Sequence, residues 1–351
     1  MELRGWDQLD VLLINGDAYV DHPTFGIPAL ARWFERRGLR VGIVPQPRVD
    51  CSDDILRMGR PRLFVGVSAG TVDSMINNYT ANKKVRSDDM YSEGGRAYRK
   101  IPVTSVARAD GARGAAFKEE RIRPDYATIA YAKLARQAFP DVPVIAGGVE
   151  ISLRRLAHFD YWQNRIRPSM LVECDADLVV FGMGERTAIR IAEDFKKASE
   201  LSGGPLSLSH DATRAALKRL KGERGIAFTC SREESKEIQP RLKIPSFEEV
   251  RDDKRKFSKA AYFIEYEASP YNGRRLMQDH GQKTVVINPP ALPLSQEEMD
   301  SIYELPFCKE QHPMYKERIP AADMIRFSVA STRGCFGGCS FCAITLHQGR
   351  I

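Results

Sequence analysis

Residues 10–38, DVLLINGDAYVDHPTFGIPALARWFERRG, contain the first strand–turn–helix unit of this sequence. Residues 10–15, DVLLIN, are apolar enough for a strand that is buried on both faces. After a polar turn, residues 25–38 space their apolar side chains at helical intervals and end on glycine, a common residue after a helix. A buried strand followed directly by an amphipathic helix is typical of α/β folds.

The same alternation continues to about residue 199 and predicts a Rossmann-like, doubly wound parallel sheet for residues 1–200. Further strands are predicted in 40–47, 62–70, 142–150 and 176–181, and helices in 124–139, 152–162 and 185–198. One segment, residues 71–123, is polar and lacks apolar periodicity. It follows a strand end, where ligand-binding loops gather, but its composition fits a long surface loop equally well.

Residues 201–324 are predicted to form a connecting α/β module. They begin with the linker-like LSGGPLSLSH (201–210) and contain strands at 225–230 and 284–287. Two helices are marked by capping boxes, in which Ser246 pairs with Glu249 and Ser295 with Glu298. Residues 325–331, IRFSVAS, are then predicted to be a strand that leads into the last segment.

The composition is that of an ordinary globular protein, with 28% charged residues and a net charge of +7. A basic balance is compatible with a nucleic-acid partner, but the basic residues are scattered, so we favour a solvated surface. No signal peptide or membrane-length apolar run is present, which predicts a cytoplasmic protein without a membrane partner. Clustered cysteines in that compartment indicate a metal rather than disulfides.

Cys335, Cys339 and Cys342 form such a cluster, in the glycine-rich loop CFGGCSFC. A structural zinc site would need a fourth ligand, which Cys308 or His347 could supply. A ferredoxin-type cluster would need four cysteines at other spacings. A third alternative is a 4Fe-4S cluster held by three thiolates, which would leave one iron open for a small molecule. Three inert buried cysteines are the remaining alternative.

The C-x3-C-x2-C spacing, with Phe341 before the third cysteine, resembles the radical S-adenosylmethionine (radical SAM) superfamily. Five blocks before the cysteine motif extend the resemblance along the chain: GDAYVDHPTFG, GVSAGTVDSMINNYT, GGVEISLRRLAHFDYW, LVVFGMGERT and INPPALPL. Together with RGCFGGCSFCAITLHQGR, which contains the three cysteines, they make the chain similar to the YgiQ-type radical SAM proteins. That family has no established function.

The resemblance implies that Cys335, Cys339 and Cys342 bind a 4Fe-4S cluster whose open iron chelates S-adenosylmethionine. Cleavage of S-adenosylmethionine would give a 5′-deoxyadenosyl radical that abstracts hydrogen from an unknown substrate. Phe341 would contact the adenine, mainly through its backbone, and a flavodoxin or ferredoxin would donate the electron. Residues 325–351 would be the start of an incomplete (β/α) barrel. The alternative function is an α/β module that binds a partner or nucleic acid and carries an accessory iron–sulfur or zinc site.

The N-terminal domain also resembles cobalamin-binding-like domains, whose ligating histidine lies in D-x-H-x-x-G. Here Asp21 directly precedes His22, and Gly26 lies four residues beyond it, so this departure argues against cobalamin.

Two glycine-rich turns, 146–150 (AGGVE) and 182–185 (GMGE), are predicted at one edge of the sheet, where they serve as tight turns or anion sites. The predicted helix 152–162 carries four polar candidates for a substrate or interdomain contact, or for a solvated face: Arg154, Arg155, His158 and Asp160. The remaining cysteines are interpreted as packing or structural residues: Cys51, Cys174, Cys230 and Cys308.

Overall fold

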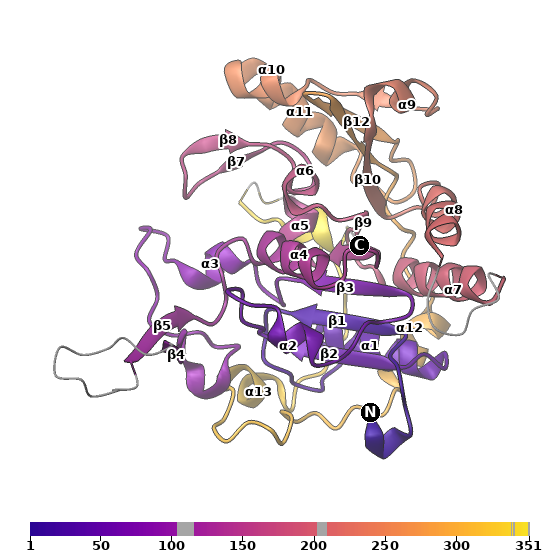
Figure 1. Ribbon diagram of the computed structural model, residues 1–351. Helices are drawn as coiled ribbons and strands as arrows, with labels where there is room; N and C mark the ends of the chain where they lie inside the picture. The colour runs from indigo at the N-terminus through magenta and orange to yellow at the C-terminus, as the bar shows by residue number, and fades with distance from the viewer. Residues whose placement is uncertain (104–115, 202–208, 338, 340, 350–351) are drawn as a thin grey trace.

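A nine-stranded mixed sheet organises the protein (Figure 1). The computed structural model describes residues 1–103, 116–201, 209–337, 339 and 341–349. In sheet order the strands are β11 (Leu242–Lys243), β12 (Leu276–His280), β13 (Lys283–Ile287), β10 (Ile226–Ser231), β9 (Leu178–Val180), β6 (Val144–Gly147), β3 (Phe64–Ser68), β1 (Val11–Asn15) and β2 (Val41–Pro45).

Five neighbouring strands, β2-β1-β3-β6-β9, are parallel, as the sequence predicts for its first half. Numbered along the chain, their order is 2-1-3-4-5, which is one of the two common orders of doubly wound sheets. The order reverses between β1 and β3. In such folds ligands bind at that switch point, outside the carboxyl ends of the strands.

The residues assigned to a connecting module extend the same sheet. Strand β10 pairs antiparallel with β9, with Ile226 opposite Val180, and also antiparallel with β13. Strands β12 and β13 form an antiparallel hairpin, and the short β11 pairs parallel with β12. The sheet is therefore mostly parallel in its first half and mixed as a whole.

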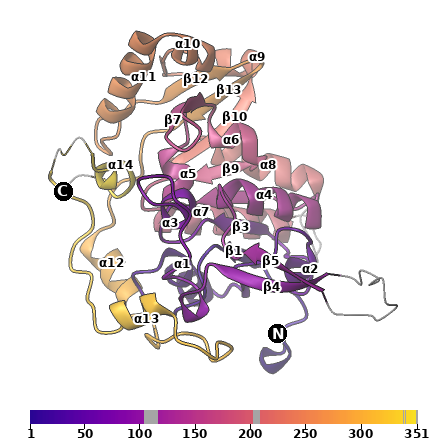
Figure 2. The same cartoon turned by 90° about the vertical axis from the view of Figure 1, so that its left-hand side faces the viewer.

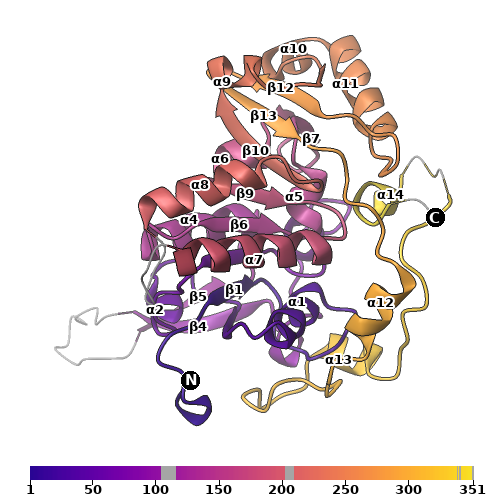
Figure 3. The same ribbon diagram turned by 90° about the vertical axis from the view of Figure 1, so that its right-hand side faces the viewer.

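Helices cover both faces of the sheet. On one face lie α1 (Gly26–Arg36), α7 (Glu185–Leu201), α8 (His210–Leu220) and α12 (Gln296–Tyr303), of which α7 and α8 are in front of the strands in Figure 3. The other face is covered by α2 (Asp53–Leu56), α4 (Ala127–Ala138), α5 (Val149–Leu153), α6 (Met170–Cys174), α10 (Phe247–Asp252) and α11 (Lys254–Tyr266). Short helices η1 (Glu2–Arg4) and α9 (Arg232–Lys236) lie outside these layers.

Strand β1 shows why the sequence produces two cores. Its side chains alternate, so that Leu12 and Ile14 belong to the core beneath α4, while Val11 and Leu13 belong to the core beneath α1 and α7. All five strand residues are buried. Burial on both faces is the physical reason that the run is apolar throughout rather than alternating.

The polar segment 71–123 is not one unstructured loop in its described part. It contains α3 (Ser74–Asn78), η2 (Glu93–Gly95) and an antiparallel pair, β4 (Tyr98–Val103) and β5 (Ala116–Arg121). A second small antiparallel pair is formed by β7 (His158–Asp160) and β8 (Arg165–Arg167).

Three predicted elements differ in the structure. Helix α4 begins at Ala127 rather than near residue 124, because Tyr126 adopts a left-handed conformation with φ of 49°. The predicted helix 152–162 stops at Leu153, and His158 lies in β7 instead. Arg154 and His158 therefore do not share a helix face.

The predicted strand over 325–331 is also wrong. Helix α13 (Pro320–Ile325) ends there, and residues 326–331 follow as turn and coil. Phe327 is 90% exposed and Val329 is 84% exposed. A strand is held by ladder bonds to a neighbour, and within the described ranges these residues pair with none. The described residues 326–331 therefore do not show the first strand of a barrel.

The last part of the chain returns to the first loop. The segment after α12 pairs with the β1–α1 loop, where Val20 bridges to Gln311, and α13 packs against the same loop through Ile319. The chain then reaches α14 (Ile344–His347), which packs beside α5 (Figure 2). Within the described ranges, no helix is both long and apolar enough to span a bilayer.

Candidate functional site

A cavity of about 510 Å³ lies at the carboxyl edge of the parallel strands. Its wall contains the residues that follow β1, β3, β6 and β9, the start of α1, and one side of α14. Asn15 ends β1 and Asp17 follows it, and Ser68 ends β3 and Gly70 follows it, so the cavity sits at the switch point of the sheet. The N-terminal sheet and α14, the helix that follows the cysteine loop, therefore line one cavity.

Both predicted glycine turns reach this cavity. Gly148 has φ of +88°, and a Cβ there would lie 2.7 Å from the Ser68 hydroxyl oxygen. Gly182 has φ of +75°, and its Cβ would lie 3.2 Å from the carbonyl oxygen of His347. Glycine at these turns lets the backbone approach β3 and α14 closely. Close packing therefore accounts for both turns. The helix after the first turn, α5, has only five residues, so it offers no long helix dipole to an anion at that turn.

A buried ion-pair network holds the polar segment 71–123 against this edge. Arg123 is about 1% exposed, and its guanidinium donates to Asp17 (Nη2–Oδ1, 2.8 Å) and Asp89 (Nε–Oδ2, 3.2 Å). It also donates to the carbonyl oxygen of Ala69. Asp17 in turn accepts from the backbone N–H of Thr71 at 2.6 Å. One cation thus joins the loops after β1 and β3 to the end of the insertion.

A second network joins the loop after β3 to the segment that follows β6. Glu150, fully buried, accepts backbone N–H groups from Ser74 (2.8 Å) and Thr128 (2.9 Å). Asp73 caps α3 and pairs with Arg154. Arg154 and Glu150 therefore act as structural links between loops, which explains their polarity without a ligand.

An ion pair connects the start of the cysteine loop to helix α7. Arg333, just before Cys335, pairs with Glu185 at the first turn of α7.

Beyond the loop, His347 of α14 lies near Arg155. Burial, and to a smaller extent the charge of Arg155, lowers the pKa of His347 to about 4. Arg155 is 5% exposed and lies over the Phe181 ring at 4.7 Å, and burial lowers its pKa to about 10.

The thiols provide a donor set suited to an iron–sulfur cluster. The backbone N–H of Gly337 donates to the Cys335 sulfur at 3.3 Å. A Cβ at position 337 would lie 3.3 Å from Cys335 Sγ and 3.7 Å from Cys339 Sγ, so glycine leaves this side of both sulfurs open. Three soft thiolates in a glycine-rich loop fit iron–sulfur ligation. Within the described ranges the three are not gathered as a metal site, so their sulfurs would have to come closer together to hold a cluster.

Other predicted residues lie elsewhere. His22 is fully buried, its Nδ1 is 2.8 Å from the Thr24 hydroxyl, and it does not line the cavity. Phe341 is 90% exposed and also lies off the cavity wall. Cys174 and Cys230 are buried, as a packing role predicts, whereas Cys51 is half-buried and Cys308 is exposed. The network around Arg123 was not predicted, and its only sequence signal was an arginine ending a polar insertion.

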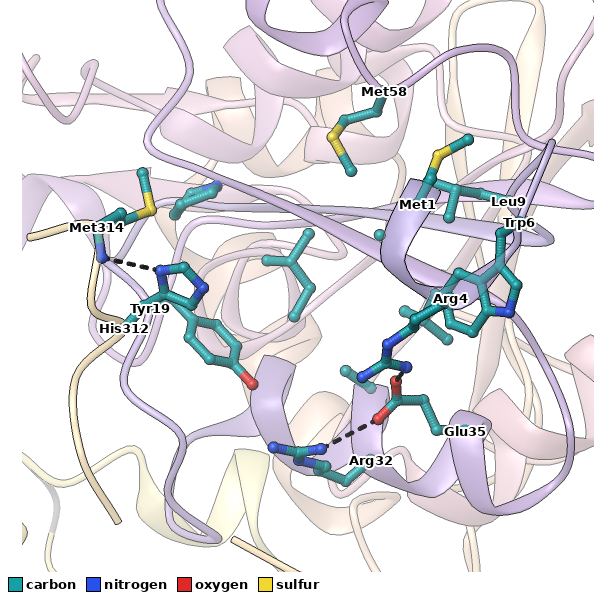
Figure 4. Close-up of a pocket in the computed structure, with 15 residues that line it drawn as sticks. Met1, Arg4, Trp6, Leu9, Tyr19, Arg32, Glu35, Met58, His312 and Met314 are labelled. Carbon is teal, nitrogen blue, oxygen red and sulfur yellow. Dashed lines mark hydrogen bonds and ion pairs between the residues drawn. The ribbon is translucent and has the colours of Figure 1, made fainter. Parts of the chain in front are cut away.

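A second cavity of about 470 Å³ opens beside the edge strand β2 (Figure 4). Arg4, Arg32 and Glu35 form a chain of ion pairs along it, and Met1, Met58 and Met314 lie around it. Arg32 also pairs with Asp21 at 2.7 Å. These charges satisfy one another, and none of the three clustered cysteines or α14 contributes to the wall.

The half-buried His158 and the buried His280 are expected to make the stability pH-dependent. Burial lowers the pKa of His158 and of His280 to about 4, from an ordinary value of 6.5. The folded protein then binds fewer protons than the unfolded chain below pH 6.5, so stability is complete above that pH and falls as pH approaches 4. By pH 5 we expect a loss of about 1–2 kcal/mol per histidine in urea unfolding. The variant with both His158→Gln and His280→Gln should reduce this slope between pH 7 and 5 and leave the share of His347, whose pKa burial also lowers to about 4; an unchanged slope would contradict the assignment.

Comparison with known proteins supports the family resemblance that the sequence indicates. A family model described as "Radical SAM N-terminal" matches residues 1–328. The chain is 43% identical over 354 residues to a UPF0313 protein of Bacteroides thetaiotaomicron, covering 100% of this chain and 52% of the relative. It is 41% identical over 394 residues to the UPF0313 protein YgiQ of Escherichia coli K12, covering 100% of this chain and 50% of YgiQ. No solved structure gives a significant match.

The doubly wound sheet and the family match define the class: this is an α/β protein of the radical SAM N-terminal type. The chain belongs to the UPF0313 family, which includes YgiQ. It spans about half the length of the curated relatives it matches. The resemblance in the sequence is thereby confirmed at the level of the family.

Proposed function

We propose that this protein is a radical S-adenosylmethionine enzyme in which Cys335, Cys339 and Cys342 bind a 4Fe-4S cluster. The observation that carries the proposal is the position of α14. This helix begins two residues after Cys342 and forms part of the wall of the cavity at the switch point. Chemistry that starts at the cysteine loop would therefore occur close to a ligand held by the N-terminal sheet.

The chain's own residues have defined tasks in this proposal. The three thiolates hold the cluster, and the Gly337 N–H stabilises one of them. The ion pair between Arg333 and Glu185 fixes the start of the loop relative to α7. When bound, a cluster of this kind supplies the electron that cleaves S-adenosylmethionine and so generates a radical that abstracts hydrogen from a substrate.

The test is formation of 5′-deoxyadenosine. The intact protein is reconstituted anaerobically with iron and sulfide, then incubated with S-adenosylmethionine and either dithionite or a reduced flavodoxin or ferredoxin. We expect 5′-deoxyadenosine and methionine in equal amounts, and none from the Cys339→Ala variant. A tightly held zinc ion, or a reconstituted cluster that leaves S-adenosylmethionine intact, would contradict the proposal.

A further inference from the structure

Two hydrogen-bond acceptors on the cavity wall have no partner among the described residues. Asn15, at the end of β1, is 2% exposed; its Nδ2 donates to the carbonyl oxygen of Asp17, but its Oδ1 accepts nothing. Glu185, at the start of α7, is 7% exposed; its Oε1 pairs with Arg333, but its Oε2 accepts nothing. A buried acceptor without a partner costs about 1–3 kcal/mol, so each favours a ligand that donates a hydrogen bond.

The charges on the wall exclude one class of ligand. Asp17, Asp73 and Glu185 line the cavity, whereas no lysine or arginine does so within the described ranges. The cations that pair with these carboxylates, Arg123, Arg154 and Arg333, lie behind them and off the wall. An anion in the cavity would face carboxylate oxygens with no lysine or arginine on the described wall to offset them, and burying it there would be costly. Phosphate and carboxylate ligands are therefore disfavoured.

Much of the remaining wall is apolar. Side chains from α1, β3 and β6 contribute Phe25, Ile27, Phe64 and Ile145, and α14 contributes Ile344. His347, also on the wall, has a buried Nδ1 without a partner and a ring that is neutral at neutral pH, since burial lowers its pKa to about 4. Such a wall suits a ligand with a flat or branched apolar body, and the cavity volume is within the range of small-molecule sites.

From this geometry we infer that the cavity binds a non-anionic small molecule with an apolar body and an N–H or O–H donor, which bonds to Glu185 Oε2 and Asn15 Oδ1. The site is made by the N-terminal sheet and α14 and needs no cluster. Its test is therefore separate from the test of radical chemistry, and neither failure implies the other.

Three probes with one indole ring and different side chains test the inference. Tryptophol carries a neutral hydroxyl, tryptamine a cationic amine and indole-3-acetate a carboxylate. Binding is measured by titration calorimetry at pH 7 on the protein as purified and after reconstitution. We expect tryptophol and tryptamine to bind, and indole-3-acetate to bind at least about tenfold more weakly than either. Equal or tighter binding of indole-3-acetate, or no binding of all three at millimolar concentration, would overturn the inference.

Variants on α7 identify the acceptor. Glu185→Gln should weaken tryptamine binding at least about tenfold, because the ammonium loses its carboxylate partner. Glu193→Gln, on the same helix but paired with Arg37 outside the cavity, should leave binding unchanged. Arg333→Met removes the other partner of Glu185 and should keep or tighten tryptamine binding. A loss in Arg333→Met as large as in Glu185→Gln would show that the ion pair only shapes the loop, and would overturn the assignment to Glu185.

Discussion

Replacing Cys335, Cys339 or Cys342 with alanine, one at a time, is expected to remove the iron–sulfur cluster. Each variant would leave only two thiolates in the loop, and two do not hold a 4Fe-4S cluster. After anaerobic reconstitution we expect about four irons per chain in the wild type and less than about one in each variant, together with loss of the broad absorbance near 400 nm.

The other cysteines provide the matched control. Cys308 is exposed like Cys339, and Cys51 is half-buried like Cys335 and Cys342. Cys308→Ala and Cys51→Ala should therefore keep the full iron content. If Cys308→Ala lost iron as completely as the loop variants, Cys308 would be a fourth ligand, and the open iron on which the proposed function depends would not exist.

Arg123→Met is expected to lower the free energy of unfolding by about 3–5 kcal/mol, the usual cost of removing one partner from a buried ion pair. Asp17 and Asp89 would stay buried after losing the cation that both contact. The deficit should be largest at pH 7 and should shrink as pH falls toward 4, because burial raises the pKa of Asp17 and its protonated carboxyl group no longer needs the cation. Urea unfolding at several pH values measures both effects.

Arg48→Met is the control for this prediction. Arg48 pairs with Asp50 at 2.8 Å, but both side chains are partly exposed, so its loss should change stability far less than the loss of Arg123. A comparably small loss in Arg123→Met, within about 1 kcal/mol of wild type, would mean that the network does not hold the insertion on the sheet.

The sequence predicts the five parallel strands well, because each is a short apolar run bounded by turns and followed by a helical pattern. It also locates the capping boxes at Ser246 and Ser295, which are present in the structure. It does not predict that β10, β12 and β13 join the same sheet. The pairing of strands depends on contacts between segments far apart in the chain. The local pattern of apolar residues does not determine these contacts.

Two local patterns mislead for physical reasons. Ile325, Phe327 and Val329 alternate as a half-buried strand would, yet no neighbouring strand in the described structure covers them. The strands β4 and β5 were missed because their residues are largely polar. At the site, the glycine turns could be placed at the sheet edge, since carboxyl ends of parallel strands meet there. The partnerless oxygens of Asn15 and Glu185 could not, because the state of one buried atom depends on the whole surrounding fold.

The most direct test of the central proposal is electron paramagnetic resonance of the reduced, reconstituted protein before and after addition of S-adenosylmethionine. If the three cysteines hold a 4Fe-4S cluster with an open iron, the reduced protein gives a cluster signal, and the g values shift when S-adenosylmethionine coordinates that iron. An unchanged signal would mean that all four irons have protein ligands, and no signal with one bound zinc would mean a structural metal site. Either result would contradict a radical S-adenosylmethionine enzyme.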